Sequence, residues 1–151
     1  MNERKNYPMP PYSPTDPLII RESRDWAWKV FENQAHLGHM MFIARRETEG
    51  SLVDCSPAEW QDLHSELALY ERVMTELFAP DRFNYGQFGN VWGQLHVHAY
   101  PRYRSAPEWN GKAFPDVQWG APPIPEPPSP LEGAALEEFA AWFKERLEKL
   151  A

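Results

Sequence analysis

The chain has 151 residues, enough for one domain, and its 42% hydrophobic residues allow that domain to bury a core. A net charge of −7 at pH 7 argues against stable binding to nucleic acid or to anionic membranes. The single cysteine, Cys55, excludes an internal disulfide framework and a cysteine-based zinc site, and it fits a reducing compartment.

The N-terminal residues 1–17 hold five prolines among polar residues. This composition predicts a disordered or extended arm, because it offers little apolar surface to bury. The arm does not resemble a signal peptide, and no apolar run in the chain approaches the ~20 residues that span a membrane. We therefore expect a cytoplasmic protein that makes no contact with a membrane.

Three short strands are predicted next, at residues 18–22, 26–31 and 39–44. The second is rich in aromatic residues and contains a valine, which favours a strand. The third is almost continuously apolar, as is typical of a central strand. The three segments follow one another closely, and Gly38 punctuates the second connection, so together they predict a β-meander.

A long helix is predicted over residues 56–79. Ser56 and Glu59 form a capping-box pattern, and Pro57 occupies the first helical position. Apolar residues then recur at spacings of three and four: Trp60, Leu63, Leu67, Tyr70, Met74 and Leu77. This stripe should cover one face of the sheet. The acidic residues of the helix are expected mostly to lie elsewhere on it: Glu59, Asp62, Glu66 and Glu71.

Residues 94–102 alternate between polar and apolar side chains, which predicts a strand. Its two faces carry different sets: Leu95, Val97 and Ala99 on one, and Gln94, His96, His98 and Tyr100 on the other. Pro101 is expected to end the pairing, because it has no N–H to donate. The strand thus presents two histidines in a polar row over an apolar base that should pack against the long helix.

Two histidines on one strand face can hold a metal ion, move protons or attack a phosphorus atom. Uncharged polar side chains precede the strand at Asn84, Gln87 and Asn90, between glycines that let a ligand approach the backbone. This surrounding favours a functional site over a merely solvated strand face.

A metal site would need a third protein ligand. His36, His39 and His64 are available, but none of them lies at a recognisable ligand spacing from the strand. His64, in the predicted helix, is more simply explained as a partly buried side chain. We therefore expect neither a catalytic metal nor another cofactor.

The chain ends in a proline-rich segment and a second helix. Asn110-Gly111 is a strong hairpin signal, and residues 121–130 contain six prolines, which predicts a stiff linker. Ser129 and Glu132 suggest a second capping box for a helix over residues 131–151. The apolar stripe of that helix leaves two alternatives open, docking on the sheet domain or on a second subunit.

Residues 94–102, with the sequence QLHVHAYPR, resemble the signature of the histidine-triad (HIT) superfamily, which is His-x-His-x-His-x-x, followed in some branches by Pro-Arg. Further segments are similar to the family: residues 37–46, 81–84, 89–90 and 111–120, the last typical of one bacterial branch. Two positions depart from that branch. Gln94 replaces the first histidine of the triad, and Glu47 stands where a histidine commonly follows Arg46.

The resemblance covers most of residues 18–120 and implies an α+β fold for them. The HIT-like domain would have a five-stranded antiparallel sheet with the long helix packed on it, and the C-terminal helix would be an addition. The resemblance also implies a homodimer, which the large apolar surface of the helices supports.

The resemblance assigns catalytic positions as well. His96 takes the place of the family's nucleophile, and His98 and Gln94 take the two flanking places of the triad. Gln94 can donate and accept hydrogen bonds but cannot carry charge. Rate and substrate choice would therefore differ from a complete triad, and Gln94→His would preserve or raise the rate.

Four further residues are expected to bind substrate. Asn33 resembles the family's ribose-binding position, and Gln87 and Asn90 would hold phosphate oxygens as neutral donors. Asn84 is the fourth residue expected to bind substrate. Asn33 and Asn84 could equally serve only to shape turns.

The implied activity is that of a nucleotide hydrolase or transferase. A neutral imidazole would attack the α-phosphorus of a dinucleoside polyphosphate, such as a diadenosine polyphosphate, or of a nucleoside phosphoramidate. Water would then cleave the nucleotidyl-histidine, and His98 would bond a phosphate oxygen or the leaving group. The alternative is a nucleotide-binding or scaffolding protein of the same fold, in which Gln94 marks lost or feeble catalysis.

Overall fold

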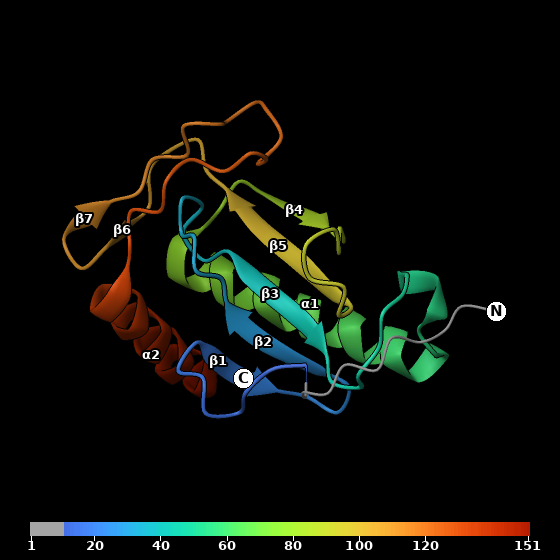
Figure 1. Ribbon diagram of the computed structural model, residues 1–151. Helices are drawn as coiled ribbons and strands as arrows, with labels where there is room; N and C mark the ends of the chain where they lie inside the picture. Colours follow the sequence, from blue (N-terminus) through green and yellow to red (C-terminus); the bar gives the residue numbers. More distant parts are fainter. Residues whose placement is uncertain (1–10) are drawn as a thin grey trace.

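The computed structural model describes residues 11–151, so most of the expected N-terminal arm, residues 1–10, lies outside the described residues. A five-stranded antiparallel sheet forms the centre of the molecule, in the order β1-β2-β3-β5-β4 (Figure 1). Its strands are β1 (Ile19–Glu22), β2 (Trp26–Val30), β3 (Met40–Ala44), β4 (Arg82–Gly86) and β5 (His96–Arg102). The predicted α+β fold, including the β-meander of the first three strands, is confirmed.

Helix α1 (Pro57–Phe78) covers one face of the sheet (Figure 1). Its start follows the predicted capping box, because the Ser56 hydroxyl accepts from the Glu59 N–H and the Glu59 carboxylate accepts from the Ser56 N–H. The helix ends at Ala79, which adopts a left-handed conformation with φ of 47° before Pro80. As expected, the apolar face of β5 is buried in the core beneath α1: Leu95, Val97 and Ala99.

The buried stripe of α1 is rotated from the predicted one. Trp60 is 43% exposed, whereas Glu59 and Glu66 are buried. Glu66 accepts hydrogen bonds from Arg21 of β1 and from the indole N–H of Trp28 in β2, so its carboxylate is paired inside the interface. The expectation was therefore wrong for Glu59 and Glu66, whose carboxylates are paired with Arg46 and Arg21, and it holds for the exposed Glu71.

Strand β5 differs from its predicted bounds at both ends. Gln94 forms only an isolated bridge, to Glu49, and the continuous strand begins at His96. At the other end Pro101 does not stop the pairing, since the strand continues to Arg102. The last β5 residue that β3 pairs is Ala99, so at Pro101 only β4 is a neighbour. A proline is tolerated there because its missing N–H faces no further strand.

The C-terminal part adds a hairpin, β6 (Glu108–Trp109) and β7 (Lys112–Ala113), and helix α2 (Gly133–Leu150). The predicted turn lies between the two short strands, with Asn110 and Gly111 both at positive φ. The apolar residues of α2 join the core of the sheet domain, so of the two alternatives α2 docks on this domain. Neither helix within residues 11–151 is long and apolar enough to cross a membrane.

The second capping box is not formed. Glu132 is the N-cap of α2 and makes no side-chain cap hydrogen bond. The Ser129 hydroxyl instead accepts from the Gln34 N–H and donates to the Leu131 carbonyl. The local pattern assigned the Ser129 side chain to the start of the helix. In the structure this side chain is instead hydrogen-bonded to Gln34, 95 residues earlier in the chain.

Candidate active site

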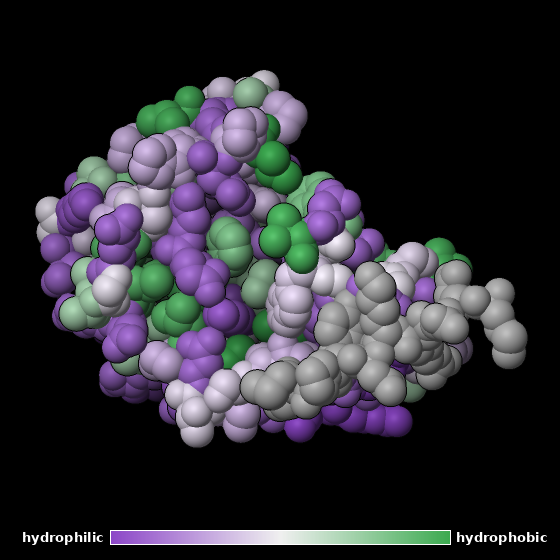
Figure 2. Space-filling view, viewed as in Figure 1, coloured by the Kyte–Doolittle hydropathy of each residue, from purple (hydrophilic) through white to green (hydrophobic). Residues whose placement is uncertain are grey.

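The sheet face opposite α1 carries a cavity of about 750 Å³ over β3 and β5. His96, His98 and Tyr100 share this face because side chains alternate along β5. The β3 residues that pair with the two histidines also line the cavity: Ile43 beside His96, and Met41 beside His98. Figure 2 views this face and shows hydrophilic and apolar side chains interspersed over it.

His96 is held in one tautomer by the backbone. Its Nδ1 lies 2.6 Å from the Gln94 carbonyl oxygen, and because a carbonyl only accepts, Nδ1 carries the hydrogen. In the neutral ring, Nε2 then bears the lone pair. The indole of Trp92 stacks on the imidazole at 5.1 Å between ring centres. No hydrogen bond within residues 11–151 occupies Nε2, so this atom is available to a ligand.

His98 is paired with a third histidine, His39. The His39 Nε2 and the His98 Nδ1 are 2.9 Å apart, so one ring donates and the other accepts. Burial, followed by the neighbouring His96, lowers the pKa of His98 to about 4. Burial also lowers the pKa of His39 well below its ordinary value, and His98 adds to this effect. Both rings are therefore neutral near pH 7.

From the sequence, the site role considered for His39 was that of a metal ligand. His39 immediately precedes β3 and is fully buried between Phe31 and Tyr100, with ring centres 4.4 and 4.0 Å away. A signal for its position was present, because alternation places it on the same strand face as Met41. What alternation could not supply was the register that brings β3 alongside β5.

No protein-family model and no curated protein matches the sequence. Several solved structures do match over most of the chain. A histidine triad protein from Sinorhizobium meliloti is 17% identical, with a TM-score of 0.71 over 89% of both chains. One from Marinobacter aquaeolei is 26% identical, with a TM-score of 0.64 over 88% of this chain and 90% of that one.

A third match, described as a hypothetical histidine triad nucleotide-binding protein from Sulfolobus tokodaii, is 18% identical. Its TM-score is 0.67 over 88% of this chain and 85% of the other. The chain therefore has the histidine-triad (HIT) fold. The five-stranded sheet and the packed helix predicted from the resemblance belong to this fold.

Gln94, which the resemblance places at the first triad position, is engaged with the backbone. It is 2% exposed and does not line the cavity. Its amide nitrogen donates to the carbonyls of Ala44 and Arg46, and its amide oxygen accepts from the Thr48 N–H. The Gln94 side chain therefore anchors the backbone segment that follows β3. Its expected catalytic role stays a prediction, because the side chain does not line the cavity.

The four expected substrate-binding residues lie in different places. Asn90 lines the cavity, whereas Asn33 donates from its amide to the Pro127 carbonyl and does not line it. Asn84 accepts a hydrogen bond from Arg102 and lines a second pocket. Gln87 lines neither pocket. Their roles toward a substrate stay predictions, and Asn90 is the one best placed for it.

The proline-rich residues 121–130 form one wall of the cavity. Ile124 and Glu126 line it, and the Glu126 carboxylate accepts a hydrogen bond of 3.0 Å from the Tyr100 hydroxyl. The bond from Asn33 to Pro127 and the Ser129 contact described above tie the segment to the end of β2. From its composition this segment was expected to be only a stiff linker.

A buried ion pair fixes the loop before this wall. Arg102 is 4% exposed and donates two hydrogen bonds to the Asp116 carboxylate. Burial alone would raise the pKa of Asp116, but the hydrogen bonds from Arg102 and from the Tyr103 N–H, together with the nearby positive charge, outweigh burial and lower the pKa. Arg102 also donates to the carbonyls of Gln118 and Ala121, so the loop is fastened directly to β5.

Within the described part of the chain, no three His, Cys, Asp or Glu side chains gather as a metal ion would require. His39 and His98 are instead hydrogen-bonded to each other, and the Nδ1 of His96 is bonded to the Gln94 carbonyl. The expected absence of a catalytic metal stays a prediction.

Proposed function

We propose that this HIT protein is a nucleotide hydrolase or transferase that cleaves a nucleotide conjugate at its α-phosphorus through a nucleotidyl-histidine intermediate. The observation that carries the proposal is the state of His96. The Gln94 carbonyl orients its ring and fixes its tautomer, and His96 lines the cavity with no hydrogen bond at Nε2 within residues 11–151. A nucleophile held in this way needs little reorganisation before in-line attack.

In the first step, the Nε2 lone pair of His96 forms a bond to the α-phosphorus, and the bond to the leaving group breaks. The leaving group departs with the electron pair. In the second step, water attacks the same phosphorus, the P–N bond breaks and its electrons return to Nε2. The nucleotide is released with the oxygen of water, and the proton of that water passes to solvent.

His98 would assist as a neutral hydrogen-bond donor. This role requires that His39 donates from Nε2–H to the Nδ1 of His98, which their 2.9 Å contact allows. The proton of His98 is then on Nε2, where it can stabilise a phosphate oxygen.

This assignment favours a polyphosphate leaving group. A neutral imidazole with a pKa of about 4 for its protonated form carries no acidic proton near pH 7. An amine leaving group would need a proton from elsewhere, whereas a phosphate chain leaves as an anion. Of the two expected substrate classes, dinucleoside polyphosphates therefore fit the site better than nucleoside phosphoramidates.

The test is to trap the intermediate with a dinucleoside polyphosphate labelled at the α-phosphorus. The reaction is quenched in alkali, where a phosphoramidate bond survives, and the labelled peptide is mapped. Wild type should carry the label on His96, and His96→Asn should lose at least about 10³-fold in turnover while still binding nucleotide. His64→Asn, an exposed histidine on α1, serves as the matched control. An active and labelled His96→Asn protein would remove the mechanism.

The alternative of a nucleotide-binding or scaffolding protein is favoured by one observation, the use of Gln94 in backbone hydrogen bonds rather than at the site. It predicts nucleotide binding without turnover of any conjugate in a panel followed by phosphorus NMR. The homodimer and the cytoplasmic location stay predictions.

A further inference from the structure

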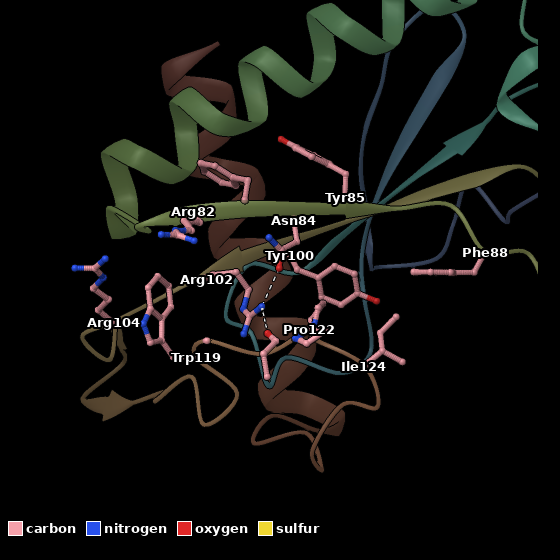
Figure 3. Close-up of a pocket in the computed structure, with 14 residues that line it drawn as sticks. Arg82, Asn84, Tyr85, Phe88, Tyr100, Arg102, Arg104, Trp119, Pro122 and Ile124 are labelled. Carbon is pink, nitrogen blue, oxygen red and sulfur yellow. Dashed lines mark hydrogen bonds between the residues drawn. The ribbon is translucent and has the colours of Figure 1, made fainter.

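A second pocket adjoins the histidine cavity along β5. Its volume is about 860 Å³, and it shares Phe88, Tyr100 and Ile124 with the cavity. Figure 3 shows these three side chains on one side of the pocket, with Arg82, Arg104 and Trp119 gathered on the other. We call it the arginine pocket, after Arg82 and Arg104.

Of the three arginines that line this pocket, Arg102 is paired with Asp116, whereas Arg82 and Arg104 have no counter-ion within residues 11–151. Their guanidinium carbons lie 5.5 and 5.3 Å from the ring centre of the same tryptophan, Trp119. The nearby Asp81 carboxylate accepts from the backbone N–H of Arg104, not from its guanidinium. Two like charges at one ring repel each other, in a chain whose net charge is −7. An anion placed between them would relieve this repulsion.

Trp119 is a fixed platform rather than a loose loop residue. Its backbone N–H donates to the Asp116 carbonyl, and the flanking carbonyls of Gln118 and Ala121 accept from the buried Arg102. The arginine pocket is therefore organised before any ligand arrives, which lowers the entropy cost of binding.

The geometry of β5 connects the arginine pocket to the nucleophile. His96 and Tyr100 lie on the same strand face, and four residues of strand span about 13 Å. A ligand bound at His96 and extended along β5 would pass Tyr100 and reach the two guanidinium groups. A phosphate chain is the group that meets both requirements, since it is extended and is recognised by arginine forks.

We infer that the arginine pocket is a second subsite, which binds the phosphate-bearing leaving half of a dinucleoside polyphosphate. This inference rests on the proposed function and names the part of the substrate that the histidine cavity does not hold. Arg82 and Arg104 would bind this half before the reaction and balance its charge as the P–O bond breaks.

The first experiment compares two substrates that share the transferred nucleotide. One is a dinucleoside tetraphosphate, and the other is a nucleoside phosphoramidate with an uncharged amine as its leaving group. In Arg82→Gln/Arg104→Gln, kcat/KM for the tetraphosphate should fall by about 10- to 100-fold. The value for the phosphoramidate should change less than about twofold. Equal losses on both substrates, or no loss on either, would overturn the inference.

The second experiment separates this inference from the proposed function. Binding of inorganic tripolyphosphate is measured by calorimetry on wild type, on Arg82→Gln/Arg104→Gln and on Arg72→Gln/Arg146→Gln. The last variant removes the same charge from exposed positions of α1 and α2, outside both pockets. Binding that weakens at least tenfold only in the first variant supports the subsite even if no conjugate is turned over. Equal affinity in all three proteins would refute it.

Discussion

Gln94→His restores the residue of the HIT signature, but the structure predicts that it destabilises the protein. Gln94 is buried and makes three hydrogen bonds, at 2.8 and 2.9 Å to the carbonyls of Ala44 and Arg46 and at 3.0 Å from the Thr48 N–H. A neutral imidazole has one donor and one acceptor. At least one of the three bonds is therefore lost, and a backbone carbonyl is left without this partner.

The size of the effect follows from these bonds. A lost hydrogen bond costs about 1 kcal/mol, and a buried polar group left unpaired adds roughly 1 to 3 kcal/mol. We expect Gln94→His to lower the free energy of unfolding by about 2 to 3 kcal/mol, which is roughly 5 to 10 °C in the thermal midpoint. The Gln94 carbonyl orients His96, so a shifted backbone should not raise the rate above wild type.

The assay is urea unfolding followed by tryptophan fluorescence, with kcat/KM measured on the same preparations. Gln94→Met is the reference, because it keeps the length of the side chain and loses all three hydrogen bonds. The expected order of stability is wild type, then Gln94→His, then Gln94→Met. A Gln94→His protein that is as stable as wild type and faster would refute this reasoning. It would support the expectation from the sequence that a histidine at position 94 preserves or raises the rate.

The buried pairs give two further predictions. The pKa of His98 is lowered from 6.5 to about 4 on folding, so between these pH values the unfolded chain binds more protons and stability falls as the pH drops. Between pH 7.0 and 4.5 wild type should lose up to about 2 kcal/mol more than His98→Asn in urea titrations, and equal losses would argue against a neutral His98. Asp116→Asn leaves Arg102 buried without its carboxylate and should cost about 3 to 5 kcal/mol. In thermal unfolding, Asp116→Asn and Arg102→Met should be strongly non-additive, and additive effects would speak against the pair.

Local patterns in the sequence predicted the elements of this fold. Alternation placed His96 and His98 on one face of a strand, the box at Ser56 began the long helix, and Asn110-Gly111 made the hairpin turn. Each of these patterns acts through hydrogen bonds or side-chain directions of residues that lie within a few positions of one another in the sequence. They could therefore be interpreted without knowing how the chain folds back.

Only the tertiary structure decided which distant groups satisfy the buried polar side chains. His39 is hydrogen-bonded to His98, 59 residues later in the chain. The Ser129 hydroxyl accepts from the backbone N–H of Gln34, 95 residues earlier, and the second capping box does not form. The arginine pocket likewise needs β4 and the loop after β5 side by side. A buried polar group must have a hydrogen-bond partner. Which group becomes that partner depends on the register of the strands and on the path of the loops, and both are set by the packing of the whole core.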